Sequence, residues 1–313
     1  MNNLLEQTQS IYHEKNLTIL NTFGLNYNID EVPLTYTYDG EIYLSDKKAL
    51  INSATKKRVG IVGKDYGVTQ NYTLADIVNR GVDKLTMDKL NIPELTPKFG
   101  GHIKGGAKVY LQFGIKGISK VGNDEILKYI TIIDSNDGST SLSVGIGDFT
   151  MSCSNEFYKF HKAGQSKFRH SATIMTRANE ISYLIESSLM ESMKQVELYQ
   201  NMEGIQINDE LKNRLIFDVL KTANGGERSI TTIDDVLRGD LHTVTQNNLD
   251  GLKHHIAKEM NQKGHNLWGL HSGVTSWTTH EKSKKDMGAK LVGTSYKYNQ
   301  KSIQFMEREL ALV

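Results

Sequence analysis

Hydrophobic and polar residues alternate through residues 31–47, on both sides of Asp39-Gly40. The apolar positions follow a period of two: Val32, Leu34, Tyr36, Ile42 and Leu44. Such a period is typical of β-strands, and Asp-Gly is a preferred turn between two of them. The segment therefore predicts a β-hairpin.

Local signals on either side of this hairpin predict further elements. Residues 4–22 carry apolar positions at helical spacing and predict an N-terminal helix. The run Arg58–Val62 predicts a short buried strand. Thr73 is a suitable N-cap with Asp76 three residues later, so we expect a helix from there to about Leu85.

The middle of the chain holds three strand-like apolar runs: Lys108–Ile115, Ile126–Asp134 and Ser141–Cys153. Turn-forming residues separate them, at Gly122-Asn123 and Asn136-Asp137-Gly138. Three strands joined by short turns favour an antiparallel meander. Because Glu156–Ala163 then looks helical, the sequence predicts a β-β-β-α unit.

The pattern changes to a helical period from Ser171 to Asn201, where apolar residues recur every three or four positions. Further helices are expected over residues 208–222, 246–262 and 296–312. The Gly-, Ser- and Thr-rich stretch Trp268–Thr279 is expected to connect the last two. The predicted fold class is α+β, with an antiparallel β-β-β-α core in the N-terminal half and a mainly helical C-terminal half.

This change of pattern predicts two regions. A β-rich basic core that includes the N-terminal helix covers residues 1–170, and a helical region covers residues 171–313. The pattern leaves open whether the helices pack on the core as one domain or form a domain of their own.

Charge and cysteine content narrow the class of protein. The 313 residues include 37 Lys and Arg and 36 Asp and Glu, so a net charge of +1 provides no global field toward nucleic acid or anionic membranes. The single cysteine, Cys153, excludes an intramolecular disulfide and a cysteine-rich zinc site and favours the cytoplasm. No apolar run of about 18 residues and no signal-peptide pattern occurs. We therefore expect a cytoplasmic protein without a membrane partner.

Positive charge is concentrated in two stretches that lack Asp and Glu, residues 98–118 and 157–179. Cations and glycine pairs suit contact with phosphates, and aromatic side chains can stack on bases. The predicted phosphate contacts are Lys98, Lys104, Lys108, Lys167, Arg169 and Arg177. The predicted stacking residues are Tyr110, Phe113 and Phe168. The pattern leaves an alternative open, in which these aromatics fill the core and the lysines only face solvent.

No pattern predicts a catalytic, metal or cofactor site. Asp134–Ser139 is oxygen-rich like part of a calcium loop but lacks the terminal Glu, so it is interpreted as a turn. The six histidines from His242 to His280 lack the spacing of zinc ligands and are expected on the surface. The chain has no P-loop or dinucleotide fingerprint, and nothing near Cys153 predicts its activation as a nucleophile. A binding protein is therefore expected rather than an enzyme.

Several short motifs resemble a known family in their order. Arg58–Gly63 followed by Asp65–Asn71 is similar to the opening motif of the phage/plasmid-like family described as domain of unknown function 932. Its later motifs resemble Asn136–Ser139, Cys153–Asn155, Phe168–Ser171 and Gly273–Trp277. The chain departs from the family at Ser135, where a histidine is common. The resemblance implies a context of phage, prophage or plasmid genes, often near replication and recombination functions.

A looser resemblance is architectural. The predicted β-β-β-α unit with basic flanks is similar to the core of single-strand annealing recombinases of the Redβ/RecT superfamily, which bind single-stranded DNA as rings or filaments without ATP. The resemblance implies a phage-type single-stranded-DNA-binding or annealing protein in recombination or replication, acting as a homo-oligomer. The alternative is a protein-interaction module without nucleic-acid binding, such as an inhibitor of a host defence factor or a virion component.

Overall fold

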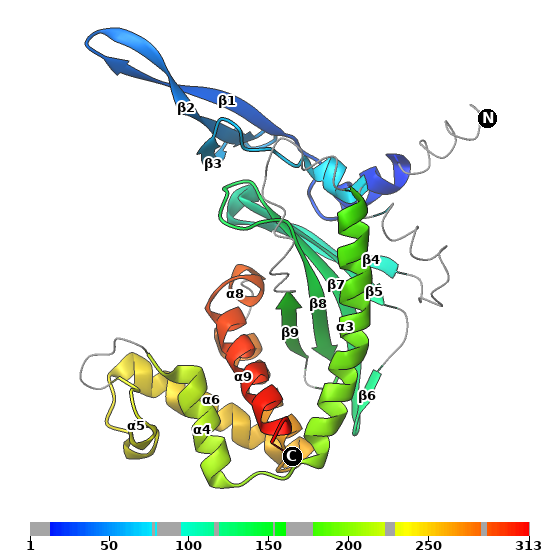
Figure 1. Cartoon of the computed structure of the whole chain (residues 1–313), viewed down its shortest axis with the longest axis vertical. Helices are drawn as coiled ribbons and strands as arrows, with labels where there is room; N and C mark the ends of the chain where they lie inside the picture. Colours follow the sequence, from blue (N-terminus) through cyan, green and yellow to red (C-terminus); the bar gives the residue numbers. More distant parts are fainter. Residues whose placement is uncertain are drawn as a thin grey trace, which may run out of the picture. The chain divides into compact units, whose positions relative to one another are not determined.

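The computed structural model describes residues 13–76, 79, 95–115, 119–152, 154–160, 178–222, 229–282 and 287–312 (Figure 1). The chain divides into two compact units. Unit 1 comprises Met1–Gly117, Tyr129–Ile146 and Phe160–Met190; unit 2 comprises Ile118–Lys128, Gly147–Lys159 and Glu191–Val313. The predicted boundary near residue 170 falls outside the described residues. Within the described ranges, no helix is long and apolar enough to cross a membrane.

Unit 1 contains a three-stranded antiparallel sheet in the order β1 (Ile29–Tyr38), β2 (Glu41–Asn52) and β3 (Arg58–Gly63). The predicted hairpin is confirmed. Asp39 and Gly40 both have positive φ, 50° and 79°, as this two-residue turn requires.

The third strand of this sheet is short and half-exposed. Val59 and Val62 are buried, whereas Ile61 is exposed, so the prediction of a buried strand was wrong for one face. β3 pairs with β2 only over Lys47–Ile51. Beyond that point β1 and β2 continue as a two-stranded hairpin, residues 34–46, which we call the arm.

A second sheet has the order β4–β5–β7–β8–β9, with β6 paired to β7. Its strands are β4 (Leu95–Ile103), β5 (Lys108–Ile115), β6 (Ser119–Val121), β7 (Asp124–Ser135), β8 (Ser143–Thr150) and β9 (Asn155–Phe160). The three predicted strands are β5, β7 and β8, and their neighbouring order is confirmed. β4 and β6 were not predicted.

Two helical segments contribute to the core of unit 1. Residues 13–22 are helical, and Ile19 and Leu20 share one hydrophobic cluster with Leu111 and Phe113 of β5. Residues 71–76 are also helical and add Leu74 to this cluster.

The predicted cap of the second helix was wrong. The helix begins at Asn71, two residues before Thr73, and Asp76 accepts a hydrogen bond from Asn16 Nδ2 at 3.0 Å. The rest of the helix predicted to reach Leu85, apart from Asn79, lies outside the described residues.

Unit 2 is mainly helical. Its helices are the C-terminal part of α3 (Ala178–Gly204), then α4 (Asp209–Leu220), α5 (Ile233–Arg238), α6 (Thr243–Lys263), α7 (Leu267–Trp277), α8 (Met287–Leu291) and α9 (Thr294–Leu310), with a π-helical turn η3 (Thr278–Lys282) after α7. The predicted helices correspond to α3, α4, α6 and α9. The residue predicted to start the second of these, Asn208, is the N-cap of α4, and its side chain accepts from Leu211 N at 2.8 Å. Tyr199, Trp277 and Phe305 lie in the core of this unit.

The helix predicted over Glu156–Ala163 was wrong, because Asn155–Phe160 form strand β9. Phe157 is buried in the core of unit 2, whereas the preceding Glu156 is only half-buried and pairs with Lys290. This alternation has a period of two, which a strand accommodates and a helix does not. The fold is α+β as predicted, but β9 takes the place of the helix that would have completed the β-β-β-α unit.

The predicted connection over Trp268–Thr279 was also wrong, because most of it forms α7, a helix with every residue buried. Small residues allow α7 to approach α6 closely. A Cβ on Gly273 would lie 2.5 Å from the Cα of Ile256, and one on Gly269 would lie 3.3 Å from the Cα of Met260. Glycine here therefore serves packing between two helices.

We expect Gly273→Ala to destabilise the protein. The new methyl group would meet main-chain atoms of α6, which cannot move aside as a flexible side chain can, and overpacking of this kind costs roughly 1–3 kcal/mol. Gly204→Ala is the matched control, because the site at the end of α3 has open space around a Cβ. Urea unfolding should show a loss for Gly273→Ala alone; equal stability of the two variants would contradict the close approach.

Candidate nucleic-acid interface

Three segments of unit 1 that are far apart in sequence meet around Asn136. Its main-chain N–H donates to the carbonyl of Ala107 at 2.7 Å, and its Nδ2 donates to the carbonyl of Gly106 at 2.9 Å. A Cβ on Gly60 of β3 would lie 2.4 Å from the Asn136 carbonyl oxygen, so only glycine fits there. These contacts fix the 3₁₀ turn η1 (Lys104–Gly106) and strand β3 to the turn that follows β7.

The other residues of the opening motif also hold the backbone. Tyr66 Oη donates to the carbonyl of Ser135 at 2.7 Å, and burial, together with nearby Asp134, raises the pKa of Tyr66, so that the phenol stays protonated. Gln70 pairs with both the N–H and the carbonyl of Ile29, at 2.8 and 2.9 Å. The motif therefore stabilises the fold and does not present a reactive group.

Four exposed cations lie on or beside two adjacent turns of unit 1. Lys56 and Lys57 lie on the turn into β3, Arg58 is the first residue of that strand, and Lys104 lies on η1. Asn52 connects the two turns: its Oδ1 accepts from main-chain N–H groups of the first turn, and its Nδ2 lies 3.2 Å from the Cβ position of Gly106. We call residues 56–58 and Lys104 the basic rim. The consecutive cations 56–58 are a sequence signal that lies outside the two acid-free stretches.

Lys108 is placed differently from the prediction. Its side chain is buried, with 6% of the residue exposed, and its Nζ donates to Thr140 Oγ1. Burial lowers the pKa of Lys108, while the nearby Asp137 carboxylate opposes that shift. Because its ammonium is used inside the protein, the prediction that Lys108 contacts phosphate is corrected.

The described aromatic candidates are not exposed for stacking. Phe113 is 1% exposed in the core of unit 1, which corrects its prediction as a base-stacking residue. Tyr110 is half-buried on β5, with its hydroxyl 3.2 Å from the Cβ position of Gly101. An exposed aromatic nearby is Phe99, which meets Tyr129 edge to face at 5.7 Å.

The predicted phosphate contacts do not all converge. Lys98 is exposed, but it lies on the first half of β4 while Lys104 follows the end of that strand, about 20 Å away at a strand rise of about 3.3 Å per residue. The remaining candidates lie outside the described residues: Lys167, Phe168, Arg169 and Arg177. Cys153 also lies outside them.

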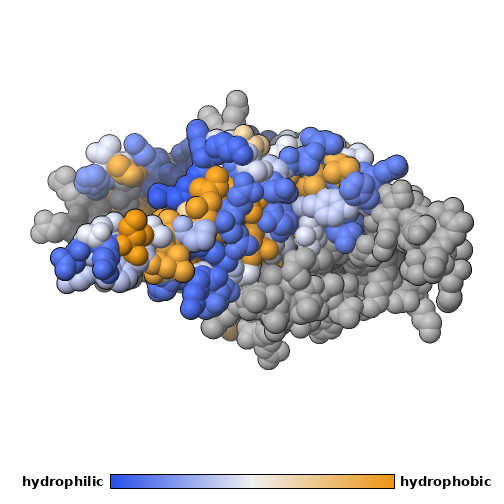
Figure 2. All heavy atoms as spheres, turned by 90° about the horizontal axis from the view of Figure 1, so that it is seen from above, coloured by the Kyte–Doolittle hydropathy of each residue, from blue (hydrophilic) through white to orange (hydrophobic). Residues whose placement is uncertain are grey.

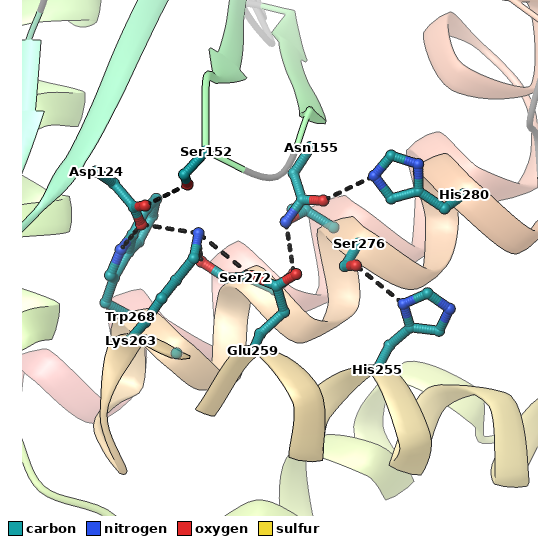
Figure 3. A network of polar contacts seen from close by, with 12 residues as sticks. Asp124, Ser152, Asn155, His255, Glu259, Lys263, Trp268, Ser272, Ser276 and His280 are labelled. Carbon is teal, nitrogen blue, oxygen red and sulfur yellow. Dashed lines mark hydrogen bonds and ion pairs between the residues drawn. The ribbon is translucent and has the colours of Figure 1, made fainter. Parts of the chain in front are cut away.

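Unit 2 contains a buried ionic network, drawn in Figure 3. Asp124, the first residue of β7, accepts from Trp268 Nε1 at 2.8 Å and from Ser152 Oγ at 2.5 Å, and it pairs with Lys263 Nζ at 2.8 Å. The same ammonium lies 3.3 Å from Glu259 Oε2. The network thus joins the ends of strands β7 and β8 to helices α6 and α7.

A second buried pair lies nearby in the same unit. Lys128 Nζ is 2.7 Å from Asp148 Oδ1, and Tyr199 Oη donates to Asp148 Oδ2 at 2.6 Å. Burial and the Asp148 carboxylate raise the pKa of Tyr199 well above its usual value, so it remains a donor. The polar atoms of these three side chains thus pair with one another inside the unit.

Asn155, the last residue of the motif Cys153–Asn155, contacts residues on both sides of the motif Gly273–Trp277 in unit 2. Asn155 Nδ2 donates to the carbonyl of Ser272 at 3.2 Å, and Asn155 Oδ1 lies 3.1 Å from His280 Nε2 (Figure 3). Among the residues that the structure describes, no group of three or more His, Cys, Asp or Glu side chains is placed to hold a metal ion. These contacts position elements of the fold, and in the same unit His255 Nδ1 lies 2.9 Å from Ser276 Oγ.

His271 on α7 corrects the expectation that the histidines lie on the surface. It is 1% exposed, its Nδ1 is 2.9 Å from Ser302 Oγ, and its ring stacks on Tyr199. Burial, with a smaller effect of the Lys263 charge, lowers the pKa of His271 to about 3. The folded protein therefore holds this histidine neutral.

Acid should weaken unit 2 through His271. Its folded pKa lies below the unfolded value of about 6.5, so the stability that it contributes is complete above pH 6.5 and is lost as the pH falls toward 3. Between pH 7 and pH 5 this amounts to roughly 2 kcal/mol of unfolding free energy. Urea unfolding should show a shallower pH dependence for His271→Gln than for wild type. An unchanged slope in His271→Gln would contradict this account.

Comparison with known proteins bears on the same residues. The family model described as Domain of unknown function (DUF932) matches residues 58–304, from the start of β3 to within α9. No curated protein and no solved structure matches the chain. The matched region includes the contacts of Gly60 with Asn136 and of Asn155 with Ser272, but not the arm. The chain belongs to the family described as Domain of unknown function (DUF932).

Proposed function

We propose that this protein binds single-stranded DNA and anneals complementary strands in phage-type recombination or replication, without ATP and as a homo-oligomer, in the cytoplasm of a bacterial host. The observation that carries the proposal is the basic rim. Its exposed cations stand together in a chain whose net charge is only +1. A polyanion with an accessible backbone is the ligand that such a surface attracts.

The backbone at the rim also suits a phosphate. Lys104 and Gly105 both have positive φ, 52° and 68°, and no atom lies within 4 Å of a Cβ placed on Gly105. A phosphate can therefore approach the main chain of η1 closely while Lys104 supplies charge. Annealing needs no bond to be made or broken, which agrees with a surface built from cations and main-chain groups.

A second candidate is a protein-interaction module that does not bind nucleic acid. The exposed apolar side chains of the arm favour it, because such a surface is typical of protein partners. The two candidates differ in one measurable property, affinity for a polynucleotide.

Charge reversal at the rim tests the proposal. Lys57→Glu/Lys104→Glu should weaken binding to labelled single-stranded DNA, measured by fluorescence anisotropy at several salt concentrations. If both lysines meet phosphates, the slope of log K against log salt should fall in magnitude by about 1.4. The reason is that each lysine–phosphate contact releases counterions from the DNA, and the variant makes two such contacts fewer.

Lys194→Glu/Lys258→Glu is the matched control, with the same change of charge at exposed helical positions of unit 2. Equal effects of the two double variants would show that only net charge matters and would remove the rim from the proposal. Absence of binding by the wild-type protein at low salt would reject the proposed function and leave the protein-interaction module.

A further inference from the structure

The arm exposes large apolar side chains along most of its length. Tyr38, Ile42 and Leu44 are 70%, 75% and 72% exposed, and Tyr36 is also exposed. Figure 2 shows a face of the molecule on which apolar side chains lie in groups among hydrophilic ones. A contiguous apolar surface of this kind marks an interaction site.

Both faces of the arm are apolar. Residues paired across the two strands share a face, so Tyr36 and Tyr43 lie on one face, where their rings stack at 5.6 Å. Ile42 and Leu44, paired with two threonines, lie on the other face. The arm belongs to none of the hydrophobic core clusters of the described residues. Since an isolated two-stranded hairpin is only marginally stable in water, a partner on its faces would stabilise the arm.

The charge of the arm identifies the chemistry of that partner. The chain has no Lys or Arg from residue 16 to residue 46, whereas the arm carries Asp39, Glu41 and Asp46. Nucleic acid is therefore repelled. The chain has 37 basic and 36 acidic residues, and all 37 basic ones but only 33 acidic ones lie outside the arm. The rest of the chain therefore has a net positive charge, whereas the arm has a net negative charge. The complementary surface is basic with apolar patches.

We propose that the arm docks on a second copy of this chain, at a surface outside the second copy's own arm. Two arms of like charge repel each other, so the contact joins two different surfaces and is heterologous. The exposed apolar side chains lie on the faces of the arm, so the faces make the contact. This assignment rests on the homo-oligomer of the proposed function and names its assembly surface.

Light scattering coupled to size-exclusion chromatography tests the assignment on the full-length protein without DNA. Wild type should form assemblies whose mass rises with concentration. Tyr38→Thr/Ile42→Thr/Leu44→Thr keeps residues suited to strands and should raise the apparent Kd of self-association by roughly 100-fold, as loss of a central contact does. A wild type that stays a single chain at every concentration, or a triple variant with wild-type mass, would overturn the proposal.

Two controls separate the arm from general effects. Leu237→Gln/Val244→Gln removes exposed apolar side chains from α5 and α6 and should leave the mass unchanged. Asp39→Asn/Glu41→Gln keeps the apolar surface of the arm but removes charge, and it should make self-association less sensitive to salt. Salt sensitivity equal to that of wild type would remove the charge complementarity on which the choice of partner depends.

Mixing the proteins tests whether the contact is heterologous. The triple variant cannot donate an arm but can still accept one, so substoichiometric amounts should shorten wild-type assemblies. Unchanged wild-type masses would overturn a heterologous contact. Anisotropy with single-stranded DNA on the same samples keeps the proposals apart, because lack of DNA binding rejects the proposed function whatever the masses are.

Discussion

The contact between Gly60 and the main-chain carbonyl of Asn136 determines where the basic rim lies in unit 1. A side chain at residue 60 would occupy the place of that carbonyl. Strand β3 can therefore pack against the turn after β7 only if residue 60 is glycine. Asn136 then binds the main chain around η1 from the other side. The two turns that carry the rim are thus positioned by backbone contacts. Their cations are not needed to hold these turns in place, which is the arrangement that a ligand-binding surface requires.

Unit 2 depends on a different kind of interaction. The ammonium of Lys263 lies between the carboxylates of Asp124 and Glu259, all of them buried. Burying charges costs solvation energy that their attraction barely repays, so such networks contribute specificity of packing more than net stability. Here the network specifies which ends of the strands meet which turns of α6 and α7. The family motifs in both units therefore correspond to constraints on the fold.

The sequence predicted elements whose pattern was local and unambiguous. The hairpin around Asp39-Gly40 and the strands flanking Asn136–Gly138 were predicted correctly. In both places the hydrophobic period and the turn residues indicate the same strand ends. α7 was missed because its glycine, serine and threonine residues resemble a loop in composition, although their small size serves contact with α6. β9 was missed because a six-residue segment contains too few apolar positions to separate a period of two from a helical one.

The candidate site was predicted less well, for a physical reason. Positive residues in an acid-free stretch share composition but not position. Lys98 lies within the first half of β4, Lys104 follows the end of that strand, and Lys108 is buried at the start of β5. Burial depends on which face of a strand packs on the core, and the sequence gives that only once the register of the sheet is known. Residues 56–58 lie next to Lys104 because Asn52 packs against Gly106, and these two residues are about 50 positions apart in the sequence.

The two units interleave along the chain, and this affects the order in which they can form during synthesis. Unit 1 takes its last segment from Phe160–Met190, after the ribosome has already made two segments of unit 2. Neither unit is a contiguous stretch that could complete its core while the other is still untranslated. Strands β7 and β8 each pass from one unit to the other within a single strand, so the nascent chain must keep both partly formed cores soluble at the same time.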